Sequence, residues 1–168
     1  MKTWKRAVQD ALIVGSFASL TSLAAMVLRS RAENGTPWAS VNAPSHWVWG
    51  NVALRQDARS LRYTALGLAI HHASAGFWGV IHEKLLCSEQ PAKADARLLA
   101  TATVVTAVAA WVDLRVVPHR LTPGFQRRLS SRSLLAVYGL FGLGLAAGSY
   151  LANRHFHAAD RPKTAPPR

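Results

Sequence analysis

The sequence has one cysteine and none of the short motifs that mark common enzymes. Cys87 alone excludes an internal disulfide framework and a metal site built only from the cysteines of one chain. The chain has no Walker loop, no HExxH motif and no GxSxG motif, and the histidine of IHEKL (residues 81–85) has no second histidine four positions later. We therefore expect neither a disulfide-stabilised domain nor an enzyme.

Acidic residues are also few, with eight Asp and Glu against twenty Lys and Arg and a formal net charge of +12. In a soluble protein such a charge would indicate nucleic acid as the partner. Here the arginines gather in connectors and at the ends of apolar runs, with no zinc-finger spacing and no isolated basic domain. We expect anionic lipid headgroups of a bilayer, and not nucleic acid, as their partners.

Long apolar runs are what the sequence contains instead. Four qualify as membrane spans, at about residues 11–28, 63–86, 98–117 and 134–153. At about 1.5 Å per residue each covers roughly 27–36 Å, enough to cross a hydrocarbon core of ~30 Å. The sequence thus predicts an all-α fold, a polytopic membrane four-helix bundle that forms one domain over residues 1–153. A disordered polar tail is expected over residues 154–168.

The longest connector, residues 29–62, separates the first two spans, and Gly35, Pro37 and Pro44 within it interrupt helices. Its segment NAPSHWVWGN places His46, Trp47 and Trp49 outside the spans. Tryptophan prefers the headgroup zone of a bilayer. We expect a long surface loop in which these three side chains are interfacial anchors.

Ionisable side chains at membrane depth are costly, so each is a candidate for a functional site. His71 and His72 lie in the middle of the second span, His82 and Glu83 lie near its end, and Asp113 lies in the third span. Eleven residues make about three helical turns, so His71 and His82 share a face and His72 and Glu83 share a neighbouring one. This candidate intramembrane polar site must face protein or water.

Each of these groups also has a structural interpretation. His71 and His72 can be neutral imidazoles that bond to hydroxyls of neighbouring helices, and His82 and Glu83 can reach the headgroups from the interface. Asp113 can pair with Arg115 or Arg120 in the connector that follows it. By depth, Asp10 at the start of the first span is a partner for His82 and Glu83.

Metal and haem binding are not expected. Haem held between two spans needs histidines on two helices at matched depth, and only the second span carries histidines in mid-membrane. His71 and His72 point about 100° apart on a helix, and no second cluster of ligands accompanies them. We predict no cofactor and no metal site.

Small residues in the fourth span predict close helix packing. Gly139, Gly144 and Gly148 fall in it, and the last two form a GxxxG pair. Small residues allow backbones to approach where lipid supplies no hydrophobic driving force. The partner is either the first span, which is also rich in small residues, or a second copy of the chain in a homo-oligomer.

Orientation in the membrane should follow from the Lys and Arg counts on the two sides. Four spans divide the twenty basic residues ten against ten. The tally therefore does not decide the orientation.

Several segments together resemble a family of small proteobacterial four-span inner-membrane proteins, some of which carry a sodium:proline symporter label. They are VNAPSHWVWGN, HHASAGFWGVIHEKL, VDLRVVPHRLTPGFQRRLS and the small-residue fourth span. The resemblance covers nearly the whole chain and implies a multi-pass protein of the bacterial inner membrane. Symporters of that kind use many more spans in inverted repeats, so four spans would need several copies to build such a site.

Two function classes follow from these observations. The first is a structural or accessory membrane component, alone or in a larger membrane complex, whose histidines serve packing. The second is a small proton-coupled transporter that uses His71, His72 and Asp113. A haem- or metal-binding subunit is a third and weaker alternative.

Overall fold

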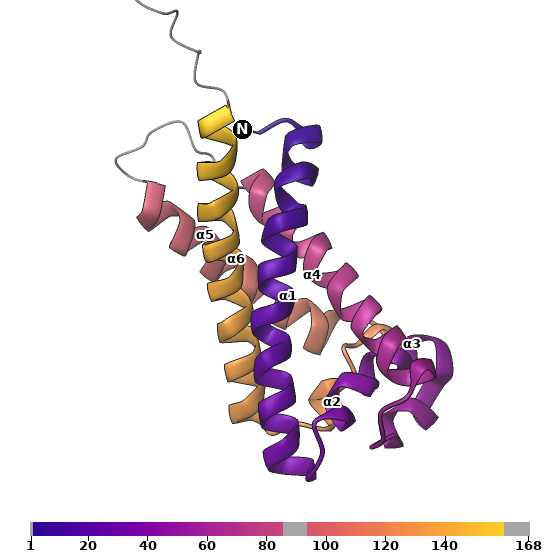
Figure 1. Ribbon diagram of the computed structural model, residues 1–168. Coiled ribbons are helices and arrows are strands. Elements are labelled where there is room, and N and C mark those ends of the chain that lie inside the picture. The colour runs from indigo at the N-terminus through magenta and orange to yellow at the C-terminus, as the bar shows by residue number, and fades with distance from the viewer. Residues whose placement is uncertain (1, 86–93, 160–168) are drawn as a thin grey trace, which may run out of the picture.

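The computed structural model describes residues 2–85 and 94–159, and every regular element in these ranges is a helix. The long helices are α1, α4, α5 and α6, and shorter α, 3-10 and π segments connect or extend them (Figure 1). In chain order the elements are α1 (Trp4–Asn34), α2 (Trp38–Asn42), η1 (Ala43–Ser45), α3 (His46–Trp49), η2 (Gly50–Arg55), η3 (Leu61–Ala65), α4 (Leu66–Leu85), α5 (Ala94–Trp111), η5 (Val112–Val116), η6 (His119–Leu121), η7 (Phe125–Arg127) and α6 (Ser131–Ala159). The expectation of an all-α fold is confirmed.

Helices α1 and α6 lie side by side and antiparallel (Figure 1). Their backbones nearly touch, since a Cβ added to Gly144 would lie 2.6 Å from Ala18 Cα and one added to Gly148 would lie 2.7 Å from Val14 Cα. Within this chain the GxxxG pair therefore packs against the first helix. Gly139 does not take part, because a Cβ there would meet no atom within 4 Å.

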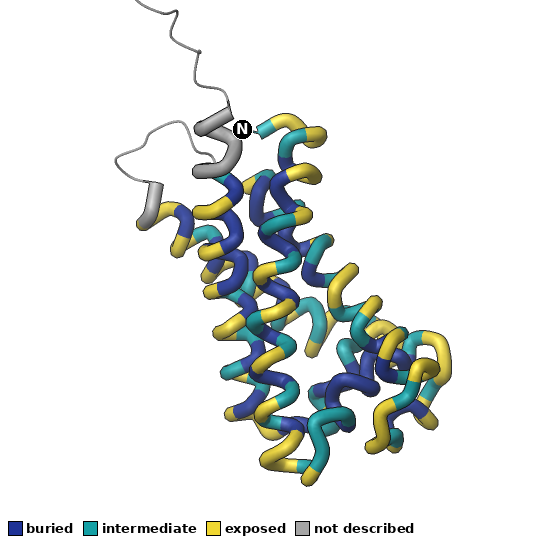
Figure 2. Tube along the Cα trace, viewed as in Figure 1, coloured by how far each residue is buried: buried dark blue, intermediate teal, exposed yellow. Residues whose placement is uncertain are grey.

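Helix α4 packs on another side of α1 through a second set of glycines. A Cβ added to Gly15 would lie 2.6 Å from Gly76 Cα, and one added to Gly79 would lie 3.1 Å from Gly15 N. Helix α5 packs against α6, where Gly142 faces the Thr106 side chain. Buried residues follow the inner faces of the helices, and exposed ones follow the outer faces (Figure 2).

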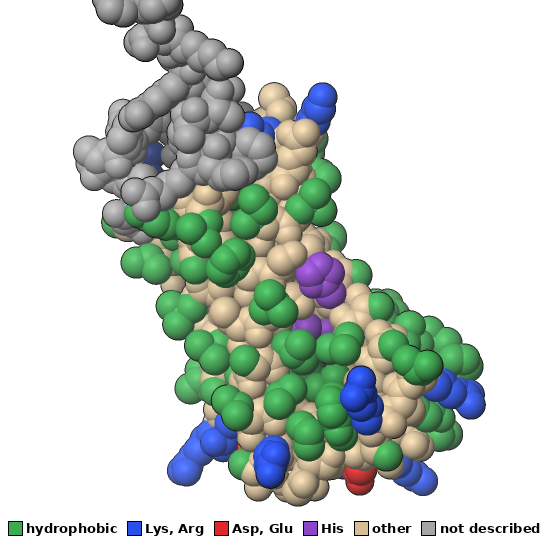
Figure 3. All heavy atoms as spheres, in the orientation of Figure 1, with side chains coloured by type: hydrophobic (Ala, Val, Ile, Leu, Met, Phe, Trp, Pro, Cys, Tyr) green, Lys and Arg blue, Asp and Glu red, His purple; other side chains and the backbone are tan. Residues whose placement is uncertain are grey.

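Three helices are long and apolar enough to cross a membrane, judged by length and composition: Trp4–Asn34, Ala96–Val116 and Ser131–Asn153 among the described residues. Their outward side chains include exposed leucines, valines and aromatics, such as Leu12, Val104 and Leu135. Hydrophobic side chains cover the middle of the face seen in Figure 3, with Lys and Arg toward its two ends. These features are those of a membrane protein.

Helix α4, which covers the predicted second span, is not among these three. It is long enough, but its 20 residues include His71, His72, His82, Glu83 and Lys84, which lower its hydropathy. By length and composition, the described residues thus contain three candidate spans, and α4 is not one of them.

The connector between α1 and α4 is not the open surface loop that the sequence predicts. Short helices occupy most of it, and the eight residues 39–46 are all buried. The polar members of this stretch are satisfied by backbone carbonyls: Ser40 Oγ donates to Met26 O (3.1 Å), and Asn42 Nδ2 donates to Gln56 O and Ala58 O (both 2.9 Å). These bonds let a polar, proline-containing segment pack under the bundle.

Two predicted segments fall partly or wholly beyond the described ranges. Helix α6 continues to Ala159 and thus enters the predicted tail, while residues 160–168 lie outside the described residues. The turn between the second and third spans also falls largely there, at residues 86–93.

Candidate functional site

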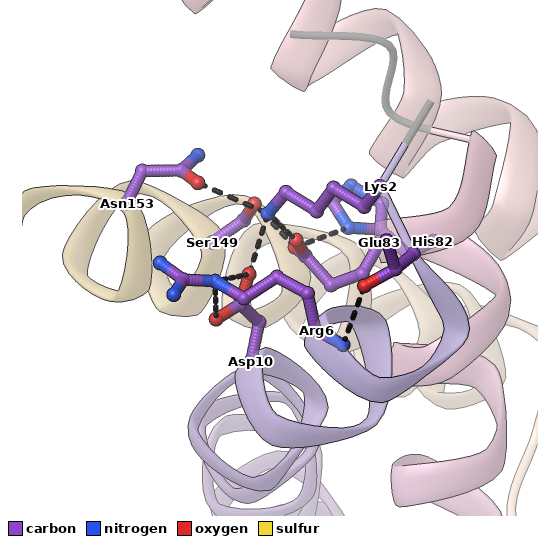
Figure 4. A network of polar contacts seen from close by, with 8 residues as sticks. Lys2, Arg6, Asp10, His82, Glu83, Ser149 and Asn153 are labelled. Atoms are coloured by element: carbon purple, nitrogen blue, oxygen red, sulfur yellow. Dashed lines mark hydrogen bonds and ion pairs between the residues drawn. The ribbon is translucent and has the colours of Figure 1, made fainter. Parts of the chain in front are cut away.

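A polar cluster lies at the end of the bundle where α1 begins and α4 and α6 approach their ends (Figure 4). Its side chains come from α1 and the residues just before it, from the last turns of α4 and from α6. We call it the N-terminal polar cluster; its members are Lys2, Arg6, Asp10, His82, Glu83, Ser149 and Asn153.

The Lys2 ammonium is the centre of this cluster. Its Nζ lies 2.7 Å from Asp10 Oδ2 and 3.0 Å from Asn153 Oδ1, and it also forms an ion pair with Glu83. Arg6 Nε lies 3.1 Å from the other Asp10 oxygen. Both carboxylates are fully buried, at 0% exposure. Two cations therefore balance two carboxylates in a region removed from solvent.

Glu83 has further donors around its second oxygen. Ser149 Oγ donates to Oε1 at 2.5 Å, and His82 Nδ1 lies 3.3 Å from the same atom. A hydrogen on Nδ1 leaves the lone pair of a neutral imidazole on Nε2. That Nε2 atom is buried and has no hydrogen-bond partner within the described part of the chain.

The sequence placed His82 and Glu83 at matching depth with Asp10, and the structure does bring Asp10 and Glu83 onto one cation. His82 and Glu83 do not reach outward to headgroups, because both are fully buried in protein. Lys2, Ser149 and Asn153 were not predicted. Only the depth of Ser149 and Asn153 in an antiparallel fourth span could have indicated them.

A cavity lies in the half of the bundle nearer the connector. All four long helices or their extensions line it, together with η1, α3, η6 and η7. Asp113 lies in its wall, and Tyr138 Oη donates to Asp113 Oδ2 at 3.0 Å. The expected ion pair to Arg115 or Arg120 is not found among the described residues. Arg120 instead donates to the backbone oxygens of Trp47 (3.0 Å) and Val48 (3.2 Å).

His71 lines the same cavity and is bonded to α1. Its Nε2 lies 3.1 Å from Ser22 Oγ and 3.3 Å from Ser19 O. A carbonyl oxygen only accepts, so Nε2 carries a hydrogen and Nδ1 of the neutral ring is an acceptor. His72 is exposed and takes no part, which follows from its position about 100° further around α4.

The three predicted interfacial side chains separate into two groups. His46 is buried between backbone oxygens of Ala43 (2.9 Å from Nδ1) and His119 (3.2 Å from Nε2). Trp47 Nε1 donates to Thr122 O at 2.7 Å. Both side chains thus tie the first connector to the third. Trp49 remains 38% exposed.

Within residues 2–85 and 96–153, whose side chains the structure describes, no group of three or more His, Cys, Asp or Glu could hold a metal ion. The two polar regions therefore differ in chemistry. The N-terminal polar cluster pairs buried carboxylates with cations, whereas the cavity contains a carboxylate whose described partner is the Tyr138 hydroxyl. No protein-family model, no curated protein and no solved structure matches this chain.

Proposed function

We propose that the protein is a multi-pass component of the bacterial inner membrane with four spans. The three apolar helices supply α1, α5 and α6 as spans. The sequence resemblance to small inner-membrane proteins supports the location. The remaining question is whether α4 also crosses.

The direction of α4 supports a crossing. Just before it, Thr64 Oγ1 donates to Asn42 Oδ1 (2.7 Å) beside the connector, and near its end Glu83 pairs with Lys2. The helix therefore runs from the level where α1 ends back to the level where α1 begins, over 20 residues or about 30 Å. Two of its ionisable groups, His82 and Glu83, are covered by protein, which reduces the cost of the crossing.

Cysteine labelling tests this topology. In a Cys87→Ser background, Lys5→Cys, Arg55→Cys and Leu85→Cys are compared for reaction with a membrane-impermeant maleimide in sealed vesicles. Four spans predict that Lys5→Cys and Leu85→Cys react from one side and Arg55→Cys from the other. Reaction of Leu85→Cys from the same side as Arg55→Cys would show that α4 does not cross.

We infer further that the protein is a structural or accessory membrane component and not an enzyme. This inference rests on one observation: the charged side chains pair with one another or accept hydrogen bonds from neighbouring helices. Besides the N-terminal polar cluster, Glu33 accepts from Ser130 N (2.7 Å) and pairs with Arg29 (3.2 Å) at the other end of the bundle. Such contacts hold helices in place and leave these groups without a reacting partner.

A carrier is the second candidate, and the cavity that contains Asp113 and His71 favours it. The double variant His71→Asn/His72→Gln separates the two functions in proteoliposomes with an imposed pH gradient. If the protein is an accessory component, neither the parent nor the double variant shows proton flux driven by the gradient. The double variant then differs from the parent only by a lower melting temperature. A proton-coupled carrier shows flux that the double variant abolishes.

A further inference from the structure

We propose that the cavity beside Asp113 binds an organic monocation, a protonated amine with an apolar body, with Asp113 as its counter-ion. The proposal needs the helix packing described above, and it is independent of whether the protein transports what it binds. It concerns a binding site in the wall of the bundle, separate from the N-terminal polar cluster.

The cavity wall has one negative charge and no positive charge among its described lining residues. Asp113 is the one acidic residue in the lining, and no Lys or Arg belongs to the lining residues among those described. Tyr138 Oη is the partner that the structure gives Asp113. A half-buried carboxylate with no cation in the lining of its cavity would be stabilised by a ligand cation.

The cavity wall is also rich in aromatic rings, which favour an amine with an apolar body. Rings of Trp47, Trp78, Phe125, Tyr138 and Phe141 line the same cavity. Aromatic faces attract ammonium groups and also cover the apolar body of an amine. A carboxylate next to several aromatic rings thus fits a cation that carries hydrocarbon.

His71 defines the polar end of the ligand further. Because its Nε2 hydrogen is directed to Ser22 and Ser19 on α1, its Nδ1 is an acceptor on a side chain that lines the cavity. An ammonium N–H can donate to this nitrogen as well as to Asp113. A bare divalent cation would require several oxygen ligands, and an anion would be repelled by Asp113.

The surroundings of the cavity agree with this ligand class. The basic groups nearby face elsewhere: Arg120 donates to the Trp47 and Val48 backbone, and Arg115 and His119 are exposed. None of the three lines the cavity, and no Lys or Arg is found among its described lining residues.

Calorimetric titration of the purified full chain in detergent micelles tests the proposal. The probes are 2-phenylethylammonium and its neutral analogue 2-phenylethanol, which share size and ring. We expect the amine to bind at least about tenfold more tightly than the alcohol, because only the amine meets the carboxylate with a charge. Equal affinities would overturn the proposal without any variant being made.

The variant Asp113→Asn keeps an oxygen for the Tyr138 hydroxyl and removes the charge. We expect it to lose about tenfold or more in amine affinity and to bind the alcohol as the parent does. Asp57→Asn is the matched control, since Asp57 is exposed, pairs with Arg128 and does not line the cavity, and it should bind both probes like the parent. Unchanged amine affinity in Asp113→Asn would contradict the assignment. Failure of flux in proteoliposomes would reject the carrier role and leave this binding result intact.

Discussion

Lys2 and Glu83 form an ion pair inside the bundle although 81 positions separate them in the chain. Glu83 is fully buried, and only 15% of the Lys2 side chain is exposed. The residues just before α1 are therefore part of the helix packing, and the cation they supply serves two carboxylates from two helices.

Removal of this cation should destabilise the fold. In Lys2→Met, the buried carboxylates of Asp10 and Glu83 lose the ammonium that they share, and breaking a buried pair costs about 3 kcal/mol. We expect a clearly lower melting temperature in detergent, measured by circular dichroism. Lys5→Met is the control, because Lys5 is exposed and should unfold like the parent. A further Glu83→Gln change in the Lys2→Met background should recover part of the loss, and no recovery would argue against the pair.

The contact of α1 with α6 should be sensitive to one methyl group. Gly144→Ala would place Cβ 2.6 Å from Ala18 Cα, a backbone atom that cannot move alone. We expect a loss of about 1–3 kcal/mol in the free energy of unfolding, from overpacking. Gly139→Ala meets nothing within 4 Å and should be neutral or slightly stabilising. Equal effects of the two changes would mean that the helices do not pack through this face.

The two tryptophans of α3 should differ in their contribution to stability. Trp47→Phe removes a donor that reaches Thr122 O at 2.7 Å and should cost about 1 kcal/mol. Trp49 Nε1 makes a longer bond, 3.3 Å to Arg62 O, at the surface, so Trp49→Phe should change thermal unfolding less. Thermal melts of both variants in the same detergent measure the difference. A larger effect of Trp49→Phe would contradict the burial of the connector.

Salt should speed the association of the proposed amine ligand. The chain carries a net charge of +12, and the exposed Arg115 is two residues after Asp113 in the sequence. Raising ionic strength from about 0.01 M to about 1 M shortens the screening length from ~30 Å to ~3 Å, so repulsion of an incoming cation weakens. Stopped-flow tryptophan fluorescence would show a faster bimolecular rate at high salt. A slower rate at high salt would indicate that attraction of the amine by Asp113 outweighs repulsion by the net positive charge of the chain.

The helical core could be predicted from hydropathy, and the connector could not. Charge-free runs place α1, α5 and α6 because a helix in lipid must be apolar outside. The segment around Ala39 and Asn42 contains polar residues and prolines that indicate a loop. Its burial depends on bonds to distant carbonyls, such as Met26 O and Ala58 O, which no local pattern specifies.

The sequence predicted those parts of the candidate site in which helical geometry alone fixes the relative positions of the residues. Matched depth relates Asp10 to Glu83, and the 100° step separates His71 from His72. Helical spacing also explains Gly139, which lies five residues before Gly144 and so about 140° away from its face. Lys2 could not be predicted, because a flexible side chain outside any span has no periodic relation to its partners.

The N-terminal polar cluster also sets an order for biogenesis. Helix α1 leaves the ribosome before α4 and α6, so Asp10 emerges together with both of its cations, Lys2 and Arg6, which precede it in the chain. Glu83 is synthesised later, and Ser149 and Asn153 follow in the helix whose glycines fit α1. The acid of α1 therefore has its counter-ions from the start of synthesis, whereas Glu83 gains its ammonium partner only when α4 packs against the finished α1.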